Sequence, residues 1–117
     1  MMGSGCRLDR DERKIVLAAL RQHCDYRNWI LHAAHVRSSH VHVVVTASLA
    51  PEVILGQLKA YAARALNKAH GQRLRRWSHH GSTRYLWEPL QVAAAVDYVV
   101  CQQGLPMALY DREDHAA

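Results

Sequence analysis

The sequence has few cysteines and no long apolar segment. Three cysteines occur in 117 residues, and Cys6, Cys24 and Cys101 lie far apart in the chain. This spacing argues against a disulfide framework and against a Cys-x-x-Cys zinc site, so we interpret Cys101 as a buried small hydrophobe. No apolar run approaches the roughly 20 residues that span a bilayer, and the charged start is not a signal peptide. We expect a cytoplasmic protein with no membrane partner.

The sequence also lacks internal repeats, low-complexity tracts and linkers rich in proline, glycine or serine. Hydrophobic residues make up 50% of the chain and charged residues 21%, which excludes wholesale disorder. A chain of this length has room for one domain. We therefore expect a single domain over residues 1–117 with an acidic tail over 108–117, in which the end from Asp111 to Asp114 is frayed.

Acidic residues are absent between Glu52 and Glu88, although the net charge of the whole chain is only +5. The cations in this stretch are Lys59, Arg64, Lys68, Arg73, Arg75, Arg76 and Arg84, and the aromatic residues interleaved with them are Tyr61, Trp77, Tyr85 and Trp87. Cations bind phosphates, and aromatic rings stack on unpaired bases. The pattern indicates a nucleic-acid-binding surface, or alternatively a solvated face with the aromatic rings in the core.

Apolar periodicity and capping residues predict an alternation of helices and strands. A helix over 10–25 begins at the cap Asp9, with Glu12 three residues later. The further elements are strands over 29–36 and 40–46, a helix from Pro51 to about Ala69 ended by Gly71, a strand within 76–87, and a helix from about Pro89 to Cys101. This order predicts an α+β fold with helices packed on an antiparallel sheet.

His40 and His42 are two residues apart in a stretch rich in β-branched residues. On a strand they share one face with Val44, because successive side chains alternate. Two such imidazoles can share a divalent ion, although the pattern alone is more often structural. His32 and His35 lie on opposite faces of the preceding strand, so at most one of them can approach this face, and structural roles are favoured for both.

Tyr98 and Gln102 are four residues apart, hence neighbours on one face of the last helix. A phenol beside an amide oxygen can supply a nucleophile and a metal ligand. For the isolated pair, a core tyrosine and a surface glutamine is the commoner arrangement.

The combination of these motifs resembles the single-tyrosine HUH transposases. The resemblance rests on His40-Val41-His42, a helix started by Pro51 with Lys59-Ala60-Tyr61, then Trp77, Gly81 and Tyr98-Val99-Val100-Cys101-Gln102. It is closest to the REP-associated tyrosine transposase group, with the insertion-sequence-200-like transposase domain, and covers roughly residues 8 to 105.

The resemblance implies a ferredoxin-like fold that acts on single-stranded, hairpin-forming DNA as a homodimer, nucleoid-associated when bound to DNA. It implies that His40, His42 and Gln102 hold Mg²⁺ or Mn²⁺, and that Tyr98 attacks the scissile phosphate. The products would be a 5′-phosphotyrosine and a free 3′-hydroxyl, which can be resealed without ATP. The residues expected to bind nucleic acid are Lys59, Arg64, Lys68, Arg73, Arg75, Arg76, Trp77 and Arg84.

The chain departs from the family at its start. The family usually has a strand before the first helix, whereas only Met1 to Leu8 precede Asp9. We expect this strand to be missing, and three explanations remain open: the chain is truncated at its start, the sheet has an open edge, or a partner supplies the strand. Two other functions remain open: a non-catalytic module that binds DNA or RNA hairpins on the same fold, and a metal-binding or structural protein.

Overall fold

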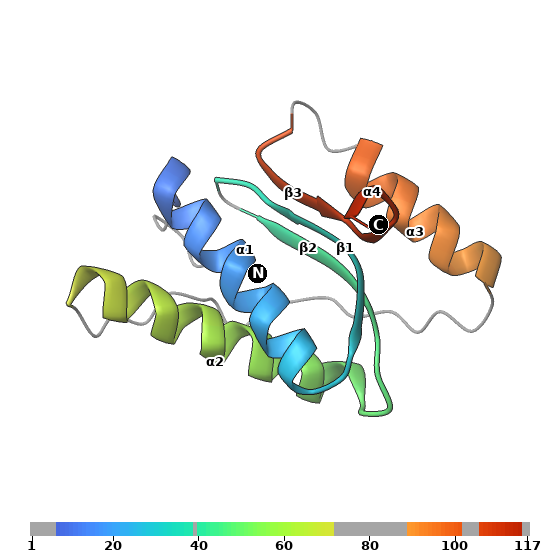
Figure 1. Cartoon of the computed structure of the whole chain (residues 1–117), viewed down its shortest axis with the longest axis horizontal. Coiled ribbons are helices and arrows are strands. Elements are labelled where there is room, and N and C mark those ends of the chain that lie inside the picture. Colours follow the sequence, from blue (N-terminus) through green and yellow to red (C-terminus); the bar gives the residue numbers. More distant parts are fainter. Residues whose placement is uncertain (1–6, 39, 72–88, 102–105, 116–117) are drawn as a thin grey trace.

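Helices cover both sides of a three-stranded antiparallel sheet in the computed structural model of the chain (Figure 1). The structure describes residues 7–38, 40–71, 89–101 and 106–115. The elements are α1 (Arg10–Tyr26), β1 (Ile30–Val36), β2 (Val41–Thr46), α2 (Pro51–His70), α3 (Pro89–Cys101), β3 (Ala108–Asp111) and the single-turn α4 (Arg112–His115). The predicted α+β class is confirmed.

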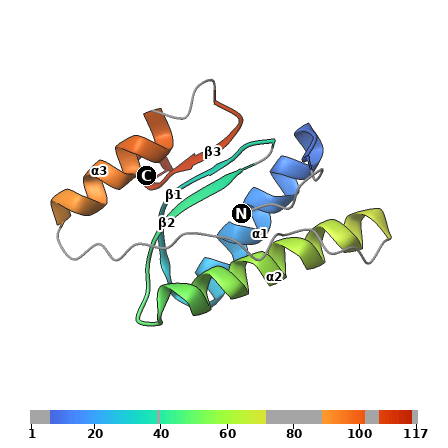
Figure 2. The same cartoon turned by 180° about the vertical axis from the view of Figure 1, so that it is seen from behind.

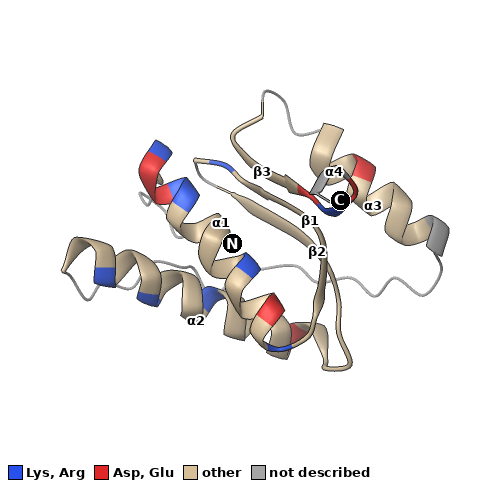
Figure 3. Ribbon diagram, viewed as in Figure 1, with Lys and Arg blue, Asp and Glu red and all other residues tan. Residues whose placement is uncertain are grey.

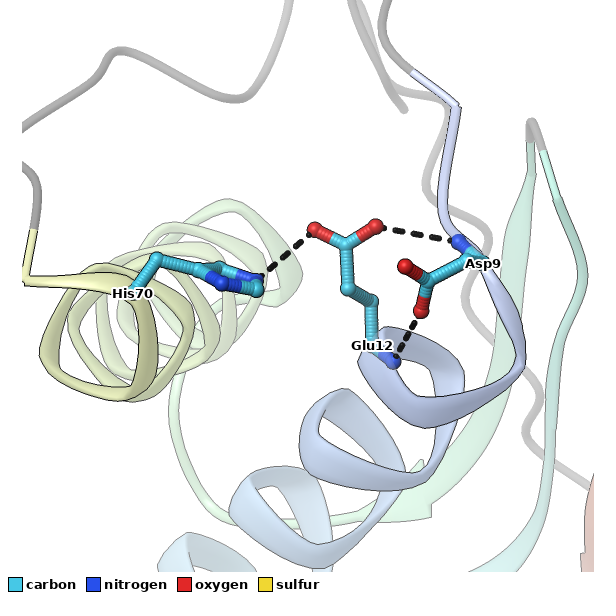
Figure 4. A network of polar contacts seen from close by, with 3 residues as sticks. All are labelled: Asp9, Glu12 and His70. Carbon is cyan, nitrogen blue, oxygen red and sulfur yellow. Dashed lines mark hydrogen bonds and ion pairs between the residues drawn. The ribbon is translucent and has the colours of Figure 1, made fainter.

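The first helix begins at the capping box that the sequence predicts. The Glu12 amide donates to Asp9 Oδ1 at 2.8 Å, and the Asp9 amide donates to Glu12 Oε1 at 3.0 Å. The second oxygen of Glu12 accepts a hydrogen bond from His70 Nε2 at 3.1 Å (Figure 4). Glu12 therefore joins the start of α1 to the end of α2, in addition to satisfying an exposed amide of the first turn.

The second helix begins and ends at the residues that the sequence predicts. Pro51 occupies the first turn, where its missing N–H costs no hydrogen bond. Gly71 ends the helix in the left-handed conformation, with φ 64°, and its N–H donates to the carbonyl oxygens of Asn67 and Lys68. Glycine suits this position because it has no Cβ to clash with the backbone.

The sheet has the order β2-β1-β3. The amide of Arg37 donates to the carbonyl oxygen of His40 at 2.8 Å and closes the tight turn between β1 and β2. β3 pairs with the other edge of β1, from Val36 opposite Ala108 to Ala33 opposite Asp111. The prediction of a frayed end from Asp111 to Asp114 is therefore wrong, because Asp111 pairs with Ala33 and α4 begins at Arg112.

The two faces of the sheet belong to different clusters of apolar side chains. Leu31, Ala34, Val36 and Val41 pack with apolar residues of α1 and α2. Ala33 and Val44, on the other face, pack with Val99 and its neighbours on α3. Figure 2 shows the same separation from behind, with α1 and α2 side by side and α3 beyond the sheet. The last long helix is thus held on its own side of the sheet.

The position of the tyrosine helix and the burial of Cys101 differ from what the sequence predicts. The tyrosine-bearing helix is not the last element, because β3 and α4 follow it. Cys101 is exposed rather than buried, since it lies on a face of α3 that turns away from the sheet. The strand predicted within 76–87 and the chain before Arg7 lie outside the described residues. In the part of the chain that the structure describes, no helix is long and apolar enough to cross a membrane.

Candidate active site

The two histidines of the His-Val-His motif lie together at the start of β2. The ring centroids of His40 and His42 are 6.2 Å apart, and the rings are nearly parallel, with an interplanar angle of 13°. His42 is half-buried, while His40 is exposed. Val44 continues the same face of the strand and packs with α3, as the two-residue period predicts.

Tyr98 reaches this pair from α3. Its ring meets the His42 ring edge-on, with the centroids 6.4 Å apart and an interplanar angle of 87°. The tyrosine side chain is 52% exposed, so a substrate in solution can reach it, whereas the neighbouring Val99 is 5% exposed and packs on the sheet. Successive helical residues point in different directions. Val99 holds α3 against the sheet, and in that orientation the Tyr98 side chain lies beside the histidines.

His42 occupies an environment that favours its neutral form. Burial lowers the pKa of His42 below its usual 6.5, and the neighbouring imidazoles of His40 and His35 lower it further. Burial disfavours the charged form of a side chain, and nearby positive charge does the same. A neutral imidazole is the form that binds a metal ion.

A third histidine, His35, lies beside His42 on the neighbouring strand. It is the cross-strand partner of His42 and is fully buried. The Met107 amide, just before β3, donates to His35 Nε2 at 3.0 Å. His35 of β1 therefore approaches the face of the sheet that carries His42. Its hydrogen bond to Met107 connects that face to the chain segment after α3.

The residues of the site fit a divalent ion in their chemistry. Two imidazoles that share an ion hold their centroids within roughly 6 Å, given metal–nitrogen bonds of about 2.1 Å, and the 6.2 Å separation is close to that span. Among the described residues, no group of three histidine, cysteine or acidic side chains could hold a metal. Gln102, the third ligand implied by the resemblance, lies outside the described residues. A set of two imidazoles and one amide oxygen suits Mn²⁺ or Mg²⁺ with water in the open positions.

Those expected nucleic-acid-binding cations that the structure describes are not beside His42. Lys59, Arg64 and Lys68 lie along α2, whose apolar side chains share a cluster with α1 and with the opposite face of the sheet. Figure 3 shows their charges along α2, while the described part of α3 carries no lysine or arginine. The other expected residues lie outside the described part: Arg73, Arg75, Arg76, Trp77 and Arg84.

The comparison with protein families decides what kind of protein this is. The pattern of the IS200-like transposases matches residues 7–100. The chain belongs to the IS200-like transposase family. The match includes His40, His42 and Tyr98 and ends before Gln102. Neither a curated protein nor a solved structure matches the chain.

Membership gives the geometry its chemical context. The IS200-like transposases are HUH tyrosine transposases, so membership implies single-stranded DNA transposition or nicking. The structure brings one tyrosine and the two histidines of the motif together within one chain. Sequence spacing indicated each pair separately, but only the packing of α3 on the sheet shows that they meet.

Proposed function

We propose that this IS200-like transposase is a metal-dependent nickase and strand transferase for single-stranded DNA, of the REP-associated group and with a ferredoxin-like arrangement. The observation that carries the proposal is the edge-on contact between the Tyr98 ring and His42. An exposed phenol on a packed helix, next to two imidazoles able to hold an ion, is the arrangement that tyrosine attack on a phosphodiester requires.

In the proposed reaction, the Tyr98 hydroxyl oxygen attacks the phosphorus of a single-stranded DNA phosphodiester. A bond forms between the phenolic oxygen and phosphorus, and the bond from phosphorus to the 3′-oxygen breaks. The phenolic proton passes to water, and the leaving 3′-oxygen ends as a hydroxyl. A divalent ion held by His40, His42 and Gln102 would stabilise charge on the phosphoryl oxygens.

The link to Tyr98 conserves the phosphodiester energy. A second 3′-hydroxyl can attack the phosphotyrosine, which releases the tyrosine and joins two DNA ends without ATP. The exposure of Tyr98 leaves room for such an incoming end. We propose a hairpin-forming single strand as the substrate and a homodimer as the working unit.

The test is covalent trapping. Wild-type protein, Tyr98→Phe and Tyr110→Phe are incubated with labelled single-stranded hairpin DNA and Mn²⁺, then separated on a denaturing gel. We expect a shifted band for the wild type and for Tyr110→Phe, a control that removes the hydroxyl of a tyrosine on β3, and no shifted band for Tyr98→Phe. An adduct that survives Tyr98→Phe would overturn the nucleophile assignment. DNA binding on a native gel without any adduct would favour the non-catalytic hairpin-binding module.

A further inference from the structure

A groove lies on the side of the sheet away from Tyr98, between the end of α1 and the first half of α2. It encloses about 510 Å³. The residues that give it its character are His23, Tyr26, Arg27, Gly56, Tyr61 and Arg64. The proposed reaction uses none of them except Arg64, whose predicted role rested on charge alone.

The aromatic part of the groove is held in place by a ring stack. The Tyr61 ring stacks on His23, with the centroids 3.9 Å apart and an interplanar angle of 23°. His23 is 4% exposed, and its Nε2 donates to Gln57 Oε1 at 2.8 Å, which fixes the ring. Tyr61 is nevertheless 40% exposed and Tyr26 is 77% exposed. The groove therefore presents the Tyr26 ring and part of a rigidly held Tyr61 ring to solvent.

The charge of the groove is positive. The Arg64 guanidinium lies over the Tyr61 ring, 4.9 Å from its centroid, and the Arg27 guanidinium lies 5.7 Å from the Trp29 centroid. None of the described residues that line the groove is acidic. Guanidinium groups held on aromatic rings next to exposed tyrosines combine the two contacts that single-stranded nucleic acid needs, for phosphates and for bases.

Gly56 lines the groove in the middle of α2. Glycine lowers helix stability relative to alanine, and it is usually justified by a close approach or a positive φ. Neither applies here: a Cβ at Gly56 would meet no atom within 4 Å, and among the described glycines only Gly71 has a positive φ. The missing side chain leaves space in the groove instead.

We propose that this groove binds a segment of single-stranded nucleic acid, with an unpaired base against the Tyr26 ring and the exposed edge of Tyr61, and its phosphates on Arg27 and Arg64. It is a second contact, separate from the phosphodiester at Tyr98, because α1 and α2 cover one face of the sheet and α3 the other. A second copy of the chain fits less well, since two such cationic grooves would repel each other.

Two groove variants and one control test the proposal in the full chain. Gly56→Leu fills the space with a better helix former, Arg64→Gln removes one cation, and Lys14→Gln removes an exposed cation of α1 outside the groove. Binding to labelled single-stranded DNA is measured by fluorescence anisotropy over a salt series, and thermal unfolding is measured in parallel.

We expect Gly56→Leu to bind about tenfold more weakly without a lower melting temperature. Arg64→Gln should reduce the slope of log affinity against log salt by about 0.7. Lys14→Gln should leave the affinity for the single-stranded DNA unchanged. Wild-type affinity in both groove variants would overturn the proposal. A second result would also overturn the proposal: Gly56→Leu leaves the DNA affinity unchanged but changes the oligomeric state seen by sedimentation. The groove would then be an interface between copies of the chain.

Adduct formation separates this proposal from the proposed function. If the wild type forms no covalent adduct but the groove variants lose affinity, the groove proposal holds and the catalytic one fails. If the wild type forms the adduct and the groove variants bind as it does, the groove proposal fails alone.

Discussion

At the scale of single residues, the proposed metal site depends on His42, which is half-buried and lies between His40 and Tyr98. His42→Ala removes one imidazole of the proposed metal pair, and we expect the affinity for Mn²⁺ measured by calorimetry to fall about tenfold or more. His70→Ala, which changes an exposed histidine at the end of α2, is the matched control and should keep wild-type affinity. Equal Mn²⁺ affinity in the two variants would contradict the assignment.

The buried histidines make stability depend on pH. Burial lowers the pKa values of His32, His35 and His42 from 6.5, so the folded protein binds fewer protons than the unfolded chain between the lowered values and 6.5. Stability is then full above pH 6.5 and falls as the pH drops through that window. Protonated His35 also cannot accept the hydrogen bond from the Met107 amide.

We therefore predict that the melting temperature of the metal-free protein decreases as the pH falls from about 7 to about 5. His35→Gln should make this decrease shallower, whatever it does to the melting temperature at neutral pH. A pH profile in His35→Gln as steep as that of the wild type would show that His35 does not carry the effect.

The shared face of His40 and His42 could be predicted from the sequence, but the position of His35 could not. The shared face of His40 and His42 followed from the alternation of side chains along a strand, which is a local property. The position of His35 opposite His42 depends on the register between two strands, and β1 has an irregularity between Leu31 and Ala33 that shifts this register. Alternation along β1 alone could not reveal that His35 is the one that faces His42.

At the scale of elements, the docking of α3 decides where the tyrosine lies. Val99 packs with Ala33 and Val44 and is the buried residue of the helix next to Tyr98. Val99→Ala should cost about 2 kcal/mol of unfolding free energy and reduce the rate of adduct formation, because α3 is held less firmly. DNA affinity should stay near that of the wild type.

Denaturant unfolding, adduct rate and anisotropy check this prediction together. Val100→Ala, which changes a half-buried neighbour on the same helix, is the matched control and should have smaller effects on stability and rate. An unchanged adduct rate in Val99→Ala, with the expected loss of stability, would show that α3 docking does not position the nucleophile.

The elements with local signals were predicted well. The helices at Arg10–Tyr26, Pro51–His70 and Pro89–Cys101 have caps or prolines at their starts, and the first two also have a clear apolar period. The strand Ala108–Asp111 has neither, because four residues are too few to show a period. Its stability comes from pairing with β1, more than seventy residues earlier in the chain, which no local pattern reports.

At the scale of the whole molecule, the described structure separates two surfaces. The α3 side carries the histidine pair and the tyrosine, and the side of α1 and α2 carries most of the described cations (Figure 3). A single strand that contacts both must pass around the sheet. The groove and the candidate active site would then bind different parts of one DNA molecule.

The contact between Tyr98 and His42 within one chain makes a prediction about the assembly. If each site is built from a single chain, a mixture of the Tyr98→Phe and His42→Ala variants contains no complete site and forms no adduct on a denaturing gel. Adduct formation by the mixture, when neither variant forms one alone, would show that the tyrosine of one subunit serves the histidines of another.

The central claim is that Tyr98 becomes covalently joined to DNA, and peptide mass spectrometry tests it most directly. The adduct is digested with nuclease and trypsin. The peptide from residue 85 to residue 112 contains Tyr85, Tyr98 and Tyr110 with no internal lysine or arginine. We expect a nucleotide mass on this peptide that fragmentation places on Tyr98. A nucleotide on Tyr85 or Tyr110, or on another peptide, would contradict it.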